Sequence, residues 1–159
     1  AVWAELYSAE QSSRQAALSS ASDASERLLA LIRYNIYSVI GDDSSNLFTK
    51  IVHRELASPS PLHFELYKKY LEPMQKNFLT IIADYLQPEN DPEKLRACSL
   101  CIHGPIYDLL SFRFKWDENK EKRENYPLFK SQENFIEEPE KLIENIQAFI
   151  MGGLKAIRE

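Results

Sequence analysis

The residues best suited to chemistry in this sequence are two cysteines and a histidine within one predicted helix. Cys98 and Cys101 stand three residues apart and therefore share a helix face, whereas His103 turns away from them. Structural metal sites usually need four ligands, and the sequence offers no second cysteine and histidine pair to complete one. Because free cysteines are often ordinary core residues, we expect two buried, inert thiols and no metal site.

The sequence also lacks the patterns typical of a helical enzyme. It contains no Glu-x-x-His pair of the kind that di-iron bundles use, and it suggests no grouping of serine, histidine and aspartate. Only four glycines are present, which argues against a glycine-rich phosphate loop. We therefore expect no catalytic residues, no cofactor and no enzymatic activity.

The amino-acid composition indicates the compartment of the protein and excludes some classes of binding partner. The net charge is -5 and gives no basic footprint, so the chain should not bind nucleic acid by itself. No apolar run reaches the roughly 18 residues that a membrane helix needs. Two cysteines are too few for a disulfide framework and suit a reducing cytosol, so we expect a cytoplasmic protein without a membrane partner.

Two polar residues interrupt apolar helix faces and are candidates for contact with a ligand. Asn35 could touch a ligand, and it could equally be a hydrogen-bonded core amide. Glu55 needs a partner or a proton if it is buried. Its carboxylate could face a ligand, form an ion pair with Arg54, His53 or a residue of the following helix, or accept N–H groups where that helix starts.

The elements that must position these residues are all helices. Apolar residues recur at helical spacing and no segment of useful length alternates as a strand does, so we expect an all-α bundle of about six helices, with residues 1–159 forming one domain. Capping and stop signals, including a capping box formed by Asp23 and Glu26, place the helices from Val2 to about Ala16, Asp23 to Gly41, Ser45 to Ser58, Ser60 to about Leu86, Asp91 to about Phe114, and Pro139 to about Ile157.

Prolines shape three places in this bundle. The stretch "HRELASPSP" ends in two Ser-Pro pairs, and the residue before a proline avoids helical backbone, so Ser58 should end one helix. Ser60 can cap the next helix with Pro61 in its first position, which predicts a sharp corner. Pro73 and the Gly104–Pro105 pair lie inside predicted helices and should kink them.

The charged segment over residues 115–138 is too long for a tight turn, and we expect it to be only partly ordered. Four aromatic residues should hold it loosely against the bundle: Trp116, Tyr126, Phe129 and Phe135.

The last two predicted helices carry more apolar surface than one side of a small core can cover. We expect an isologous dimer in which these two helices pair with their mates in a four-helix bundle, unless they are instead central within their own monomer. Small residues four apart let helix backbones approach closely, and a glycine inside a helix costs up to about 1 kcal/mol against alanine, which calls for a packing reason. The expected interface consists of Leu100, His103, Tyr107, Leu110, Phe114, Ala148, Gly152 and Ala156.

Four stretches of the chain resemble a known family. They are "FTKIVHRELASPSP" over 48–61, "LEPMQKNFLTIIADYL" over 71–86, "CSLCIHGPIYDLLSFR" over 98–113 and "IENIQAFIMGGLKAI" over 143–157. In this order they are similar to the C-terminal part of a TetR-type transcriptional regulator, closest to the CecR-type (YbiH-like) branch. The Arg-Glu-Leu-Ala-x-Pro corner is the most specific part of this similarity, which spans nearly the whole chain.

The resemblance implies a sensor domain of a transcriptional regulator, expected to be a repressor. A small molecule would enter a pocket among the second to fifth helices, and the first helix would act as a lever towards a DNA-binding domain. That helix-turn-helix domain of roughly 45 residues has no counterpart in these 159 residues. This chain would therefore bind its effector and form a homodimer, while operator DNA would be contacted only through the missing N-terminal domain.

The expected pocket is mostly apolar with a few polar groups, which suits amphipathic or cationic molecules. Each aromatic member could instead be plain core. The candidates are Asn35, Phe48, Val52, Glu55, Phe64, Tyr67, Met74, Phe78, Cys98 and Ile102.

A helical protein–protein interaction module without a small-molecule ligand is the alternative function. Such a module predicts a filled core, whereas a sensor predicts a cavity.

Overall fold

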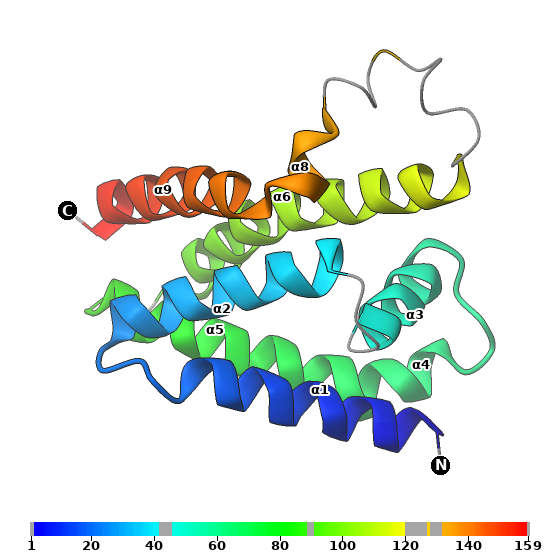
Figure 1. Cartoon of the computed structure of the whole chain (residues 1–159). Coiled ribbons are helices and arrows are strands. Elements are labelled where there is room, and N and C mark those ends of the chain that lie inside the picture. The colour runs from blue at the N-terminus through cyan, green and yellow to red at the C-terminus, as the bar shows by residue number, and fades with distance from the viewer. Residues whose placement is uncertain (1, 42–45, 89–90, 120–126, 128–131, 159) are drawn as a thin grey trace.

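The computed structural model describes residues 2–41, 46–88, 91–119, 127 and 132–158 of the chain, and these residues form helices without strands (Figure 1). The predicted all-α class is therefore confirmed. The helices are α1 (Val2–Leu18), α2 (Ala24–Ile40), α3 (Asn46–Ala57), α4 (His63–Leu66), the π-helix η1 (Tyr67–Leu71), α5 (Glu72–Leu86), α6 (Pro92–Glu118), α8 (Asn134–Glu137) and α9 (Pro139–Arg158). None of these described helices is long and apolar enough to cross a membrane.

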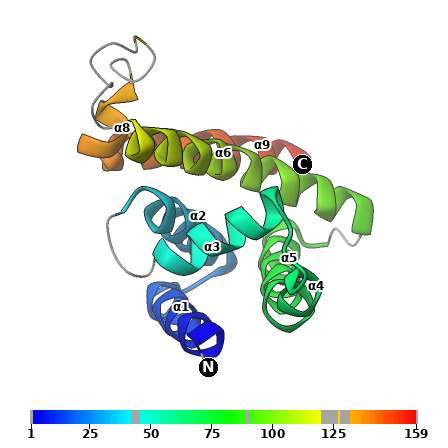
Figure 2. The same ribbon diagram turned by 90° about the vertical axis from the view of Figure 1, so that its right-hand side faces the viewer.

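Helix α2 forms the centre of the bundle. It contacts α1, α3, α5, α6 and α9, and it runs between the layer of α6 and α9 on one side and α1 with α5 on the other (Figures 1 and 2). Its sequence explains this position, because apolar residues occur on several sides of the helix rather than in one stripe. Leu28, Leu31, Ile32 and Ile36 are completely buried.

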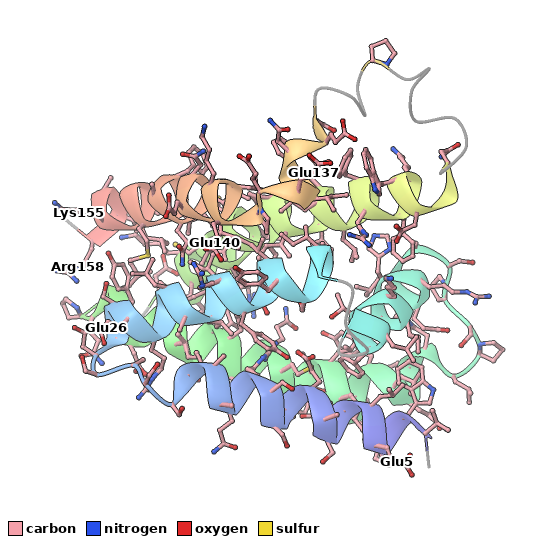
Figure 3. All side chains as sticks on the ribbon, in the orientation of Figure 1. Glu5, Glu26, Glu137, Glu140, Lys155 and Arg158 are labelled. Carbon is pink, nitrogen blue, oxygen red and sulfur yellow. The ribbon has the colours of Figure 1, made fainter. Side chains whose placement is uncertain are left out.

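Polar contacts fix the C-terminal end of α2 and its packing against α9. Arg113 of α6 donates to the carbonyl oxygen of Ile40 at 2.8 Å, which satisfies a carbonyl at the C-terminal end of α2. Glu140 lies at the start of α9 and is labelled in Figure 3. Its carboxylate pairs with Arg33 at 2.5 Å and accepts a hydrogen bond from the Tyr37 hydroxyl. Helix α9 therefore has a defined register against α2.

The predicted cap of α2 is confirmed in position but differs in one bond. Asp23 Oδ1 accepts a hydrogen bond from the Glu26 backbone N–H at 2.8 Å, as a capping box requires. The Glu26 carboxylate accepts from the backbone N–H of Ser22 at 2.8 Å, one residue further out than a capping box predicts, and this contact lowers the pKa of Glu26. Asp91 caps α6 as predicted, accepting from Glu93 N–H at 2.9 Å. The predicted cap at Ser45 lies outside the described residues.

The Ser-Pro corner is held by Glu55. Helix α3 ends at Ala57, and the Glu55 carboxylate accepts the backbone N–H of Ser60 at 3.0 Å, which lowers the pKa of Glu55. This is one of the three roles considered for Glu55, the acceptance of N–H groups at the next helix. The following helix begins at His63 rather than at Pro61, because Ser60 Oγ caps a turn at Leu62 first.

The prolines inside the predicted helices lie in two different backbone arrangements. Before Pro73 the chain forms the π-helix η1, in which the Glu72 N–H donates to the Tyr67 carbonyl five residues earlier. A π-turn accommodates a residue that cannot donate to the ladder, and the sequence did not predict this turn before Pro73. Helix α6 continues through Gly104 and Pro105 and ends at Glu118 rather than at Phe114.

Aromatic rings pack the end of α6 against α8, and this agrees with the predicted contacts of Trp116 and Phe135. Trp116 is buried and its ring centroid lies 5.8 Å from that of Phe112, which in turn lies 6.2 Å from Phe135 on α8. The predicted contacts of Tyr126 and Phe129 lie outside the described residues.

The central position of α2 predicts a large cost for truncating its buried side chains. Ile32→Ala should lower the free energy of unfolding by about 2 to 5 kcal/mol, because it leaves a cavity at a fully buried site. Urea denaturation measures this change. The control is Leu62→Ala, at an exposed leucine of the Ser-Pro corner, which should change stability by less than about 0.5 kcal/mol. Equal losses in the two variants would contradict the central role of α2.

Candidate functional site

A cavity of about 320 Å³ lies between α1, α2, α3, η1, α5 and α6. Its size falls within the range of small-molecule sites in proteins, about 300 to 1,000 Å³. Six of the ten predicted pocket residues line it, and they come from four different elements: Asn35, Phe48, Val52, Tyr67, Met74 and Phe78.

The other four predicted pocket residues lie elsewhere. Cys98 and Ile102 are buried in the apolar core behind the cavity wall. Phe64 is 65% exposed on α4 and does not line the cavity. Glu55 lies in a separate, much smaller hollow beside Trp3, in keeping with its bond at the corner.

The residues predicted for the dimer interface lie in different surroundings on α6 and α9. Leu100, His103, Tyr107 and Leu110 of α6 all line the cavity. Leu110 is 2% exposed and therefore has almost no surface to offer outside its own chain, whereas Leu100 is 73% exposed. Phe114 is half-buried and stacks on His53, with ring centroids 5.2 Å apart. Ala148, Gly152 and Ala156 are exposed on α9.

Two charged residues of the cavity were not predicted from the sequence. Glu10 and Arg14 of α1 line it and are 3% and 7% exposed. Glu10 Oε1 lies 3.9 Å from Arg14 Nη2, too far for a hydrogen bond. Their spacing of four residues is the usual spacing of a surface ion pair on a helix, so the sequence gives no sign of burial.

The environment of Glu10 opposes its charge. Burial raises the pKa of the Glu10 carboxyl, although the Tyr34 hydroxyl and the Arg14 guanidinium favour the ionised form. The Tyr34 hydroxyl donates to the Glu10 backbone carbonyl at 3.3 Å, and burial together with the neighbouring carboxylate raises the pKa of Tyr34. Helix α1 therefore brings ionisable groups into a poorly solvated part of the cavity.

His103 adds a neutral polar group to the same cavity. Its Nδ1 lies 2.9 Å from the Ser99 carbonyl oxygen, and its ring centroid lies 4.2 Å from that of Phe78. Burial lowers the pKa of His103, and the positive charge of Arg14 lowers it further. With Nδ1–H donating to the carbonyl, Nε2 is left as an acceptor.

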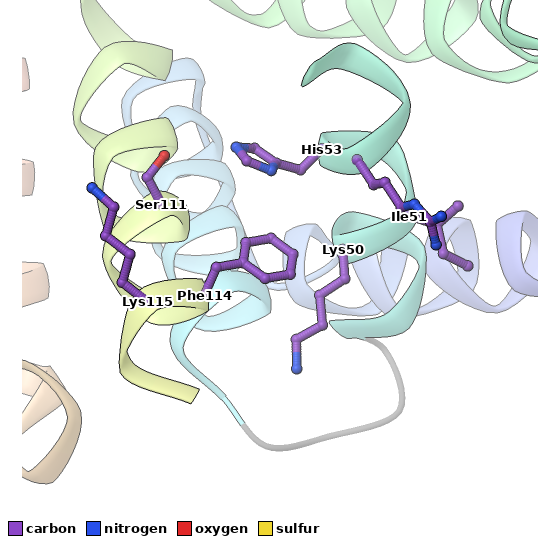
Figure 4. A pocket seen from close by; sticks show the side chains of 7 residues that line it. Lys50, Ile51, His53, Ser111, Phe114 and Lys115 are labelled. Atoms are coloured by element: carbon purple, nitrogen blue, oxygen red, sulfur yellow. The ribbon is translucent and has the colours of Figure 1, made fainter. Parts of the chain in front are cut away.

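A second hollow lies on the surface between α3 and α6 (Figure 4). This open groove of about 530 Å³ is lined by Lys50, Ile51, His53, Arg54, Ser111, Phe114 and Lys115. Lys50 Nζ lies 3.9 Å from Asp117 Oδ2, and this carboxylate offsets part of the positive charge of the groove. Because ligand sites usually bury most of their ligand, the more enclosed cavity is the stronger candidate.

The cysteines differ from the prediction at one position. Cys98 is buried as expected, but Cys101 is exposed on the outer side of α6. Within the described ranges, no three histidine, cysteine, aspartate or glutamate side chains are grouped to hold a metal ion.

Comparison with known families identifies the domain. Residues 24–154 match the family model described as the C-terminal domain of the HTH-type transcriptional dual regulator CecR. The chain belongs to this CecR C-terminal domain family. It is thus a regulatory domain of the TetR type, as the resemblance in the sequence indicated, and the family is one of transcriptional regulators rather than enzymes. Searches of curated proteins and of solved structures gave no match.

Helix α1 lies before the matched region of this CecR-type domain. The cavity nevertheless depends on it, since Glu10 and Arg14 form part of the wall.

The environment of His103 predicts its titration. Because the folded-state pKa is depressed below 6.5, the stability that neutral His103 contributes is complete above pH 6.5 and is lost as the pH falls from 6.5 towards the lowered pKa. An NMR titration of the imidazole resonances should show His103 titrating below 6.5. A value of 6.5 or higher would contradict the buried, neutral state.

Proposed function

We propose that this CecR-type domain is a cytoplasmic small-molecule sensor that controls the DNA affinity of a full-length dimeric regulator. The cavity is the observation that carries the proposal. Its wall is largely apolar and aromatic, with a few polar groups at defined places, as in most small-molecule sites. The alternative, a protein–protein interaction module with a filled core, does not account for this volume.

Aromatic stacking gives a physical route from the cavity to α1. Phe48 lines the cavity, and its ring centroid lies 6.2 Å from Trp3 and 6.0 Å from Tyr7 of α1. The ring centroid of Tyr70 of η1 lies 4.9 Å from that of Tyr7. Leu71, the residue after Tyr70, lines the cavity. A ligand that repacks Phe48 or η1 would therefore move α1.

The size of the response is limited by the ligand's differential affinity for the two arrangements of α1. Operator DNA would be contacted by a helix-turn-helix domain joined to α1 in the full-length regulator. The matched family is described as a dual regulator, so the proposal does not restrict the full-length protein to repression.

Exposed apolar side chains on α6 and α9 support the dimer. Leu100 and Phe149 are 73% and 76% exposed, and Tyr107 and Ile157 are also exposed. The two helices lie together along one side of the molecule (Figures 1 and 2). A Cβ atom built on Gly104, Gly152 or Gly153 would meet nothing within 4 Å, so packing within the described part of the chain does not require glycine there. Close approach of a second copy would require it.

Filling the cavity should abolish ligand binding without unfolding the domain. A thermal-shift screen of metabolites and drug-like compounds should yield ligands that raise the melting temperature of the wild-type chain. Val52→Phe, which adds a ring inside the cavity, should remove those shifts. The control Leu62→Phe, at the exposed corner, should keep them. If no compound shifts the wild-type chain, or if Val52→Phe keeps every shift, the sensor proposal is wrong.

Adding charge to α9 should break the dimer. Phe149→Asp should convert a dimer into a monomer in analytical ultracentrifugation, because the aspartate would be buried unpaired in the proposed interface. Phe64→Asp is the matched control, since Phe64 is similarly exposed on α4, and it should remain dimeric. A wild-type chain that stays monomeric at high concentration contradicts the interface.

A further inference from the structure

Glu10 and Arg14 form a polar corner in the cavity, and both side chains are more than nine-tenths buried. Such burial of charged groups is costly unless their hydrogen-bonding capacity is satisfied. Here it is not. Among the described residues, Glu10 Oε2 and Arg14 Nε have no hydrogen-bond partner, and the closest charged atoms of the pair are 3.9 Å apart. The corner thus has one acceptor and one donor without partners, on the same face of α1.

The charge of this corner constrains what can bind there. A carboxylate on a ligand would pair with Arg14 but would lie beside Glu10, and an ammonium group would pair with Glu10 but lie beside Arg14. At such short range in a poorly solvated site, a like charge is strongly unfavourable. His103, another polar residue of the cavity wall, is neutral and hydrogen-bonded to Ser99, so it adds no charge to compensate either case.

An uncharged group that contains a donor and an acceptor side by side avoids both penalties. Building on the proposed function, we propose that the effector carries a carboxamide or lactam group that binds between Glu10 and Arg14. Its N–H donates to the Glu10 carboxylate and its carbonyl oxygen accepts from the Arg14 guanidinium.

The rest of the wall suits an apolar body attached to this group. Phe48, Met74 and Phe78 present aromatic and thioether surface, which packs well against flat rings. The effector class is therefore an uncharged amide with an aromatic or otherwise apolar body. This replaces the wider class of amphipathic or cationic molecules expected from the sequence.

Four probes with one apolar body test this inference. They are naphthalene-2-carboxamide, naphthalene-2-carboxylate, 2-(aminomethyl)naphthalene and 2-methylnaphthalene, titrated calorimetrically into the purified chain. The carboxamide should bind at least about tenfold more tightly than each of the others, since it alone satisfies both unpaired groups without adding charge.

Two variants separate the polar corner from the rest of the cavity. The double variant Glu10→Leu/Arg14→Met replaces a buried ion pair by apolar side chains, which is often neutral or stabilising, so the domain should stay folded. It should bind the carboxamide and the methyl probe within about twofold of each other. The matched variant Thr49→Val removes a polar group elsewhere in the same wall and should keep the tenfold preference.

Any of four results would overturn the inference: no binding of the carboxamide, equal binding of all four probes, tighter binding of either charged probe, or a preference that survives in the double variant. If all four probes bind equally, the amide inference fails while the sensor proposal stands. The sensor proposal is judged separately, by the compound screen and the Val52→Phe variant.

Discussion

The burial of α2 among five other helices is the constraint from which the rest of the structure follows. Leu28, Leu31 and Ile32 have no exposed surface, so α1, α5, α6 and α9 must surround this helix. Further along the same helix, Asn35 and Ser38 replace large apolar residues, and the cavity opens there. The change from large apolar to smaller polar side chains along α2 thus separates the solid core from the hollow part of the bundle.

The sequence predicted the helices well wherever local chemistry determines them. The Asp23 and Asp91 caps and the class of the fold are confirmed, because each depends on neighbouring residues or on simple periodicity. Errors arose where tertiary packing decides. Helix α6 ends at Glu118 rather than at Phe114, and Pro73 is preceded by a π-turn that no local sequence pattern predicts.

The same limit applies to the cavity. Aromatic and aliphatic residues on apolar stripes, such as Phe78 and Met74, could be predicted as wall residues because their faces are readable from spacing. Glu10 and Arg14 could not, since a pair four residues apart looks the same in sequence whether it is solvated or enclosed. Cys101 shows the reverse case. Cysteine is usually buried, but this cysteine is exposed on the outer face of α6.

The two tryptophans occupy different surroundings, and this gives the domain a built-in optical reporter. Trp3 lies on α1 in stacking distance of Tyr70, with ring centroids 6.4 Å apart, next to the cavity wall. Trp116 is buried near the end of α6 against Phe112, within a separate aromatic cluster. Emission from Trp3 therefore reports on the environment of helix α1, while Trp116 supplies a reference signal from a part of the fold that does not line the cavity.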